Sequence, residues 1–249
     1  METSYLGNHV DTYIPIITRM HAIENGVHVI ANNISSSSVG GAKGQIVRLQ
    51  GKMKNFGAHM SLQKQDTDFS QGHFVKTDNP YNVMINNDEG FFAVKKDGRV
   101  AYTKDGRFSL DNHRRLITPD GELVMDGSGD NEITIPIDSV GIHIASDGSI
   151  YDSSEQVIAK IGVFSFQDKH KLIHIGSSSF LKTDEEDEAV QLTSPNLLSY
   201  GYESSNINAV KELTELSSIT SQYKRLSSVL KIHETQNEQG KDKYIKVWS

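Results

Sequence analysis

Two stripes of apolar residues at opposite ends of the chain constrain its fold more than any other feature. The first recurs at alternating steps of three and four, at Tyr13, Ile16, Met20, Ile23, Val27, Ile30 and Ile34. The second repeats these steps at Leu216, Ile219, Tyr223, Leu226 and Leu230. This is the spacing of a coiled-coil seam, and such a seam needs a partner helix. We therefore predict that the two terminal helices pair with each other.

Sequence signals place the limits of these helices. Asp11 or Thr12 is a candidate cap of the first helix, with Pro15 in its first turn. Serines and glycines between 35 and 41 are expected to end it. The second helix is predicted over 210–232, a stretch without Gly or Pro.

The middle of the chain changes to the two-residue period of a β-strand. Tyr81, Val83 and Ile85 alternate with polar or flexible residues, and Asp-Gly pairs begin at 97, 105, 120, 126 and 147. Asp-Gly supplies the positive φ that tight hairpin turns require, so an antiparallel meander is expected. The predicted strands lie near 91–95, 99–103, 107–110, 115–118, 132–135, 140–144 and 157–166.

The fold class expected is mainly β with terminal α-helices, which pair as a coiled coil around an inserted, all-β antiparallel domain. The stretch before that domain is interpreted as a linker, because glycines at 44, 51 and 57 each cost about 1 kcal/mol in a helix. The expected divisions are 1–34, the first helix; 35–70, a connector; 71–200, the β domain; 201–233, the second helix; and 234–249, a tail.

Composition excludes several classes of function. The chain of 249 residues has 25 basic and 32 acidic residues, and no dense basic patch, so nucleic acid is not an expected partner. It has no cysteine, which excludes thiol chemistry and disulfides. No apolar run approaches the roughly 20 residues of a membrane span, so direct membrane insertion is not expected. No ordinary signal peptide is visible.

The ends of the chain carry motifs that resemble those of the bacterial flagellar axial proteins, the family of rod and hook subunits. Ala31-Asn32-Asn33-Ile34 is similar to the signature that ends the family's first helix, followed by Gly41 and Lys43 in register. Gly40 stands where the family usually has Pro, and Ala42 where it has an aromatic residue, so the turn chemistry is altered. The stretch 203–210, Glu-Ser-Ser-Asn-Ile-Asn-Ala-Val, resembles the start of the family's last helix.

The β region carries the closer resemblance. Gln71-Gly72, Asn79-Pro80 and Gly90-Phe91-Phe92 are similar to the family's Q-G, N-P and G-F-F motifs. The stretch 102–108 is similar to Y-T-R-x-G-x-F, with Lys104 at the position of the Arg. The family's Gln-Arg pair in the last helix is replaced by Thr220-Ser221, although Tyr223 is kept.

This resemblance implies a structural subunit of the flagellar basal-body rod and not an enzyme, without a cofactor or a small-molecule substrate. Its expected partners are other rod subunits and further copies of itself, in a rod that spans the periplasm. Export by the flagellar type III apparatus would explain the missing signal peptide. Only 27 residues separate Lys43 from Gln71, which favours the proximal rod subunit. A distal rod or hook subunit, usually with a longer insertion here, is the alternative.

The candidate site residues follow from the stripes and motifs. The residues expected to pack between subunits are Ile16, Met20, Ile23, Val27, Ile30, Ala31, Asn32, Asn33, Ile34, Asn206, Asn208, Leu213, Leu216, Ile219, Tyr223, Leu226 and Leu230. The β-domain motif residues are Gln71, Gly72, Asn79, Pro80, Gly90, Phe91, Phe92, Tyr102, Gly106 and Phe108. From the residues alone, Asn32 and Asn33 are more simply helix C-caps and the stripes more simply ordinary domain core; the resemblance favours the interface interpretation.

Other kinds of site have weaker support. Asp126, Ser128, Asp130 and Glu132 alternate as in a calcium loop, but Asn131 replaces the required Gly and no helices flank the loop, so a hairpin loop is preferred. His170 and His174 are four apart in a strand and turn, which does not favour zinc. A secreted β-rich hydrolase is the rival class, and it would require an acidic cleft with two carboxylates about 5 to 10 Å apart.

Overall fold

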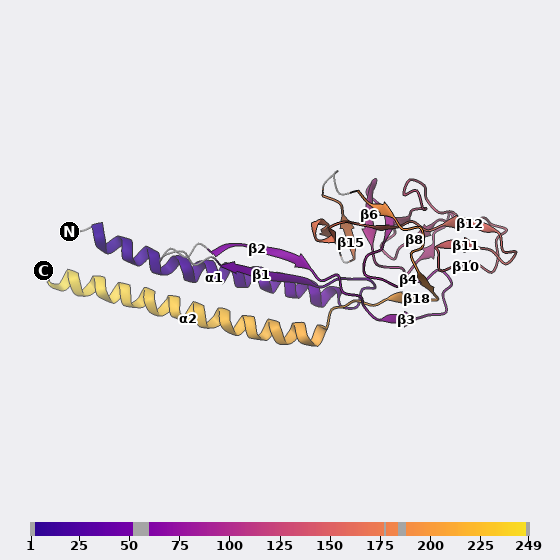
Figure 1. Ribbon diagram of the computed structural model, residues 1–249. Coiled ribbons are helices and arrows are strands. Elements are labelled where there is room, and N and C mark those ends of the chain that lie inside the picture. The colour runs from indigo at the N-terminus through magenta and orange to yellow at the C-terminus, as the bar shows by residue number, and fades with distance from the viewer. Residues whose placement is uncertain (1–2, 52–59, 177, 184–187, 248–249) are drawn as a thin grey trace. The chain divides into compact units, whose positions relative to one another are not determined.

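The computed structural model describes residues 3–51, 60–176, 178–183 and 188–247, with side chains described over 16–46, 66–176, 178–183, 188–232 and 234–235. The chain is mainly β, with a long helix at each end, as predicted (Figure 1). It divides into two compact units. The helical unit comprises Met1–Ile34, Gln45–Asp66 and Asn208–Ser249; the β unit comprises Ser35–Gly44 and Thr67–Ile207.

Two antiparallel helices make up most of the helical unit. They are α1 (Thr3–Ser36) and α2 (Ala209–Val247), which run side by side in Figure 1. Asn33 bonds to Glu212, and Glu24 accepts a hydrogen bond from Tyr223 at 3.1 Å. Because the residue number rises along α2 as it falls along α1, the two helices run in opposite directions.

Both helices are longer than predicted, and the connector contains strands. The helix α1 begins at Thr3, so the predicted caps Asp11 and Thr12 are wrong and Pro15 lies inside the helix. The helix α2 continues through the predicted tail. The strands β1 (Gln45–Gly51) and β2 (Met60–Thr67) form a two-stranded sheet where a linker was expected.

The β unit is built from short antiparallel strands. Its largest sheet has nine strands, with the order β14-β15-β6-β5-β9-β8-β7 and with β13 and β16 joined to it beside β5. A three-stranded sheet has the order β10-β11-β12, and two further pairs are β17-β4 and β18-β3. The bounds are β3 (Phe74–Lys76), β4 (Val83–Ile85), β5 (Phe91–Lys96), β6 (Arg99–Thr103), β7 (Ser109–Leu110), β8 (Leu116–Ile117), β9 (Leu123–Val124), β10 (His143–Ile144), β11 (Ser149–Tyr151), β12 (Val157–Lys160), β13 (Val163–Ser165), the short 3-10 helix η1 (Lys169–Lys171), β14 (Ile173–Ile175), β15 (Ser179–Leu181), β16 (Val190–Gln191), β17 (Leu197–Ser199) and β18 (Gly201–Glu203).

Three of the five Asp-Gly pairs turn the chain between paired strands. Gly98, Gly121 and Gly148 have positive φ and follow β5, β8 and β10, each of which pairs with the next strand. Asp126-Gly127 also begins a hairpin loop, closed by the antiparallel bridge of Met125 with Glu132, although its positive φ is at Gly129. The hairpin prediction is wrong for Asp105-Gly106. Gly106 instead lies against the carbonyl of Val83, with an added Cβ only 1.6 Å from that oxygen. The chain is therefore a meander only locally.

Two strand predictions are also wrong in detail. The stretch 132–135 contributes isolated bridges, Met125 with Glu132 and Arg115 with Thr134, and no strand. The stretch 157–166 is two strands, β12 and β13, which belong to different sheets. A break at 161–162 allows the chain to pass from one sheet to the other.

Two clusters of buried side chains hold the β unit together. The larger is mostly aliphatic and includes Val83, Val94 and Ile150. The second is aromatic and includes Phe91 and Phe180. Phe91 and Phe92 are neighbours in β5, so their side chains point to opposite faces and each enters a different cluster. The predicted G-F-F motif therefore places one ring on each face of the sheet.

Candidate functional site

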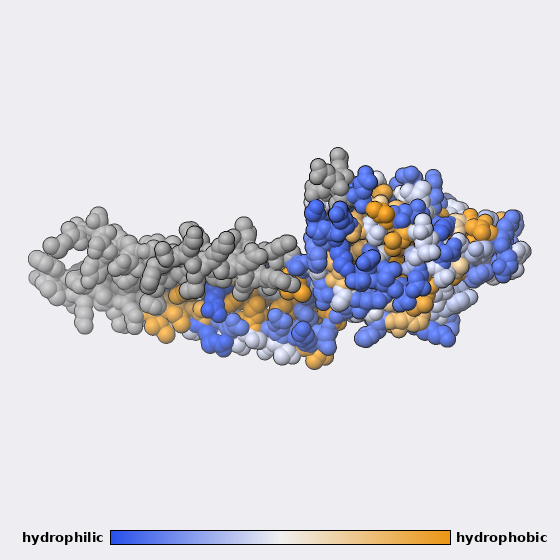
Figure 2. Space-filling view, in the orientation of Figure 1, coloured by the Kyte–Doolittle hydropathy of each residue, from blue (hydrophilic) through white to orange (hydrophobic). Residues whose placement is uncertain are grey.

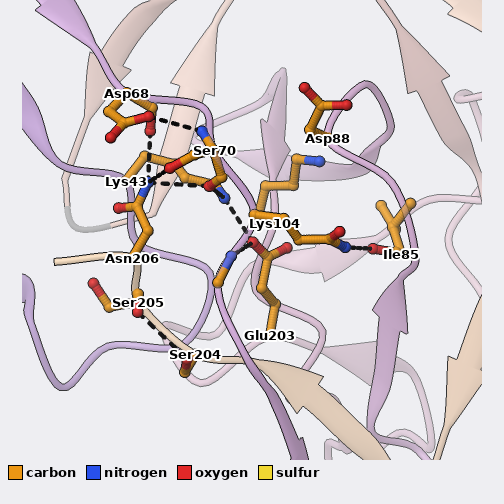
Figure 3. A network of polar contacts seen from close by, with 12 residues as sticks. Lys43, Asp68, Ser70, Ile85, Asp88, Lys104, Glu203, Ser204, Ser205 and Asn206 are labelled. Carbon is orange, nitrogen blue, oxygen red and sulfur yellow. Dashed lines mark hydrogen bonds and ion pairs between the residues drawn. The ribbon is translucent and has the colours of Figure 1, made fainter.

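The principal candidate site is a buried polar junction in the β unit, formed by Lys43, Ser70, Gly72, Glu203 and Asn206 (Figure 3). These residues come from three segments that are distant in sequence. Each segment lies next to a point where the chain passes between the helical unit and the β unit. The junction therefore joins the incoming and outgoing ends of the β unit to one another.

The centre of the junction is a buried ion pair. Lys43 Nζ lies 2.6 Å from Glu203 Oε1, and both side chains have 0% exposure. Lys43 also donates to the carbonyl oxygen of Ser70 at 2.6 Å, and the N–H of Gly72 donates to Glu203 Oε1 at 2.7 Å. Because a buried charge is tolerated when it is paired and hydrogen-bonded, this arrangement lets two charged groups lie in the interior.

Asn206 closes the junction with its side-chain amide. Its Oδ1 accepts from the N–H of Gly44 at 2.9 Å. Its Nδ2 donates to the carbonyl oxygens of Asp68 at 2.8 Å and Ser70 at 3.0 Å. The amide therefore supplies hydrogen bonds to backbone groups of both incoming segments.

Two glycines allow the segments to approach closely. Gly41 has φ +65°, and its N–H donates to the carbonyl oxygen of Glu203 at 2.7 Å. A Cβ added to Gly41 would lie 2.3 Å from the carbonyl carbon of Lys104, and one added to Gly72 would lie 1.9 Å from the carbonyl oxygen of Ser204. Real Cβ atoms do not approach so closely, so these positions require glycine.

The turn at residues 40–42, where Gly40 and Ala42 depart from the family pattern, packs against a second ion pair. Arg107 binds Asp105 through Nε and Nη2, at 2.9 Å and 2.8 Å, and this pair raises the pKa of Arg107. A Cβ on Gly40 would lie 2.5 Å from Arg107 Nε. Ala42 is fully buried. The small residues at 40 and 42 therefore fit the space that the neighbouring side chains leave.

Phe69 anchors the segment that precedes the junction. Its ring contacts Phe91 and Phe180, with centroids 5.7 Å and 5.4 Å apart. Aromatic pairs of this geometry contribute about 0.5–1.5 kcal/mol each beyond their buried area. The polar junction and the aromatic cluster thus hold the same segment from two sides.

A second candidate site is the Asn33 bracket in the helical unit, formed by Asn33, Gln45 and Glu212. Asn33 Oδ1 accepts from the N–H of Gln45, and its Nδ2 donates to the carbonyl oxygen of Gln45, both at 2.9 Å. The same Nδ2 lies 3.1 Å from Glu212 Oε2. One buried amide therefore links α1, β1 and α2, and its bonds lie within the chain.

The predicted stripes lie on the facing sides of the two helices. On α1, Ile23 and Ile30 are buried, and the other predicted aliphatic positions that are described are half-buried. On α2, the five predicted positions from Leu216 to Leu230 are all half-buried. The side chain of Tyr13 lies outside the described residues. A groove of about 440 Å³ remains between α1, α2 and β1, lined partly by Ile23 and Ile219.

Four apolar residues of α2 outside the stripe are exposed to solvent. Val210, Leu213, Val229 and Ile232 are 73%, 53%, 42% and 56% exposed. At about 100° per residue, Val210 and Ile232 fall opposite the half-buried stripe, whereas Leu213 and Val229 lie about 100° from it on its two sides. Figure 2 shows apolar residues at the surface along this helix. Ala31, Asn32 and Asn208 are also exposed, while Ile34 is half-buried.

The β-domain motif residues lie on both sides of the junction and in the core. Asn79 donates to the carbonyl oxygen of Phe108, and Gln71 donates to that of Ile85. Gly90, Gly106 and Tyr102 are buried, and Pro80 is half-buried. These residues therefore connect the first strands of the β unit to the loop that follows β6.

The loop that resembles a calcium site is satisfied by its own donors. Asp126 Oδ1 accepts from the N–H groups of Ser128 and Gly129, and Oδ2 accepts from Asn131 Nδ2 at 3.0 Å. Although burial raises the pKa of Asp126, these hydrogen bonds lower it overall. Over the described residues, no group of three or more His, Asp or Glu side chains is placed to hold a metal ion.

A recess beside this loop contains two carboxylates, Asp126 and Glu132. Glu132 is bound by Lys95 at 3.4 Å and Arg115 at 3.1 Å. Because basic groups or loop donors occupy both carboxylates, neither is arranged as a general acid, and the recess does not support the hydrolase alternative.

Asn33 and Asn206 were among the predicted site residues, whereas Lys43 and Glu203 were only part of the motifs. Lys43 and Glu203 are 160 positions apart, and each lies in a polar stretch where nothing signals burial. Glu212 and Glu24 resemble ordinary exposed helix charges. The register of Glu203 and Lys43 within terminal motifs of one family was the only available signal.

Comparison with known proteins agrees with the resemblance seen in the sequence. The family model described as "Flagellar hook protein FlgE/F/G D1 domain" matches residues 84–152, within the β unit. No helix in the described part of the chain is long and apolar enough to cross a membrane.

Several curated relatives are similar over more of the chain. The flagellar basal-body rod protein FlgG of Buchnera aphidicola subsp. Schizaphis graminum is 32% identical over 159 residues, which cover 59% of each chain. FlgG of Buchnera aphidicola subsp. Acyrthosiphon pisum is 28% identical over 80% of this chain and 86% of its own length. The rod protein FlgF of Mesorhizobium japonicum is 22% identical over 88% of this chain and 91% of its own. These are the names of rod proteins and not of enzymes, in agreement with the expectation that the chain is no enzyme.

Proposed function

We infer that this chain, which belongs to the family of bacterial flagellar rod and hook proteins, is a structural subunit of the flagellar basal-body rod. Its partners would be other axial subunits and further copies of itself. The observation that carries this proposal is the set of exposed apolar residues of α2 that lie outside the stripe facing α1. A face of this kind in an elongated helix pair is suited to association with neighbouring molecules.

Within the rod we propose that the terminal helices pair as a coiled coil and pack with those of neighbouring subunits. The antiparallel contacts of Glu24 with Tyr223 and of Asn33 with Glu212 support the pairing. The stripe residues, together with the exposed Leu213 and Val229 on the two sides of the stripe, are the proposed contact surfaces. The polar junction would then transmit force between the chain ends and the β unit, because it ties three chain segments to one ion pair.

We favour the proximal rod position, on the short spacing between Lys43 and Gln71. The distal rod is the alternative, since relatives named FlgG are similar as well as those named FlgF. We also propose that the chain is exported through the flagellar apparatus and lies in the rod that spans the periplasm.

Deletion of the chain in the bacterium that encodes it tests this function. Isolated basal bodies should lack a complete rod and the hook beyond it, and the wild-type chain supplied in trans should restore both. A strain that still assembles complete, rotating flagella without the chain would contradict the proposal. Density for this chain near the motor end or near the hook end of wild-type basal bodies would separate the two rod positions.

A further inference from the structure

Lys104 is a buried lysine next to the polar junction, in the loop that follows β6. Its side chain is 1% exposed. The Nζ atom donates to the carbonyl oxygen of Asn87 at 3.0 Å and lies 4.8 Å from the centroid of the Phe91 ring. An ammonium group has three N–H donors, whereas a neutral amine has two. Over the described residues the site therefore offers the amine one carbonyl acceptor and one aromatic face, and no carboxylate of its own.

Each carboxylate near Lys104 already has another lysine at one of its oxygens, although Glu203 Oε2 has no hydrogen-bond partner in the described part of the chain. Glu203, from β18, is bound by Lys43 at 2.6 Å. Asp88, from the loop after β4, is bound by Lys169 of η1 at 2.9 Å. If Lys104 is protonated, this part of the interior holds one cation more than it has carboxylates. The carboxylate of Asp105, the next residue, does not balance this charge, because Arg107 binds it through two nitrogens.

The electrostatic environment of Lys104 acts in the same direction. Burial is the largest effect and lowers its pKa from 10.5 to about 7, with a smaller opposing effect of Glu203. The positive charges of Lys43 and Lys169 lower the pKa further. These effects favour the neutral amine, because a buried ammonium without a carboxylate of its own is costly in free energy.

We propose that Lys104 makes the stability of the β unit depend on pH, through a proton that its amine exchanges with solvent water. With the amine neutral, the junction holds one ammonium and one carboxylate in balance. With the amine protonated, an unmatched positive charge lies beside them and weakens the packing of the loop against the junction. The inference concerns regulation of this fold and holds whether or not the chain acts in a rod.

The direction of the effect follows from proton linkage. Between about pH 7 and pH 10.5 the unfolded chain holds the proton on Lys104 and the folded chain does not. Folding is therefore favoured as the pH rises through this range, and the equilibrium constant for unfolding falls by up to about tenfold per pH unit. Below pH 7 both states hold the proton, so this contribution to pH dependence disappears.

The test uses the full-length chain with ¹³C-labelled lysine, together with Lys104→Met and Lys104→Arg. The Cε resonance that is absent from both variants should titrate near neutral pH, well below the remaining lysines. In urea unfolding, Lys104→Met should be more stable than wild type at pH 6, and the difference should shrink as the pH rises to 9. Lys104→Arg should remain destabilised over the whole range, because a guanidinium stays charged.

Two results would overturn the proposal. One is a Lys104 signal that titrates together with the exposed lysines. The other is a ratio of unfolding constants between wild type and Lys104→Met that does not change with pH. If Lys104→Arg fails to fold, the labelled wild type and Lys104→Met still decide the question.

Discussion

The β unit and the helical unit bury their side chains in different ways. The β unit has two clusters of buried residues and a fully buried ion pair whose two partners both come from the unit. In the helical unit, none of the described side chains of α2 is fully buried, although α1 has several. A sheet covered on both faces completes its own core, whereas a lone pair of helices leaves one face of each in water. We therefore expect the β unit to be stable without a partner, and the helical unit to be stabilised by neighbouring molecules.

The substitution with the largest expected effect tests whether the stability of the β unit depends on the polar junction. Lys43→Met removes the ammonium and leaves the Glu203 carboxylate buried without its cation. Such a change costs about 3–5 kcal/mol, so the urea midpoint should fall sharply. The double variant Lys43→Met with Glu203→Leu should recover part of the loss. Equal stability of wild type and Lys43→Met would show that the pair is not important.

A second change tests the close approach at the junction. Gly41→Ala should destabilise the β unit by about 1–2 kcal/mol for the positive φ and about 1–3 kcal/mol more for the clash with the Lys104 backbone. Gly98→Ala is the matched control, because Gly98 has φ +76° but open space around it. The difference between the two melting temperatures measures the clash alone. Identical losses would mean that the segments do not approach so closely in solution.

A third change acts on the helical unit. Asn33→Ala removes both hydrogen bonds to the backbone of Gln45 and should lower helical stability by about 1–3 kcal/mol. Circular dichroism at 222 nm during thermal unfolding measures this loss. Asn32→Ala, at the exposed neighbouring position, is the control. If the two variants unfold alike, the bracket does not organise the helical unit.

The smallest effect on monomer stability is expected at two exposed apolar residues of α2, Leu213 and Val229. Leu213→Gln with Val229→Gln should change the free energy of unfolding by no more than about 0.5 kcal/mol, because both side chains already lie in water. Self-association, followed by sedimentation velocity, should nevertheless weaken by more than about tenfold, since each buried aliphatic side chain contributes about 1.5–3 kcal/mol. Lys224→Gln on the same helix should leave association unchanged. Unaltered association in the double variant would exclude Leu213 and Val229 from the proposed interface.

The sequence allowed correct prediction of elements with long or regular patterns. The three-and-four spacing from Ile16 to Ile34 and from Leu216 to Leu230 correctly identified the helices and the sides they bury. The outer ends of the helices were predicted too short because the helix propensity of residues 3–11 and 234–247 is weak, and no strong signal marks where either helix ends. The strands β1 and β2 were missed because their residues are mostly polar, so neither period stands out.

The polar junction could not be derived from local pattern. Lys43 and Glu203 are single charged residues in polar segments, and only the fold brings them together. The same holds for Lys104, whose burial depends on Phe91 and on the loop at Asn87. Asp-Gly pairs predicted turns correctly at Gly98 and failed at Gly106, where a close backbone contact, and not a turn, requires the glycine.

Amide hydrogen exchange of the full-length chain, as a monomer and after self-assembly, tests the central claim most directly. The account predicts that amides of β5 and β6 are strongly protected in both states, while those of α2 exchange quickly in the monomer and slowly in the assembly. Equal and strong protection of α2 in the monomer would contradict the claim that the helical unit is completed by neighbouring molecules.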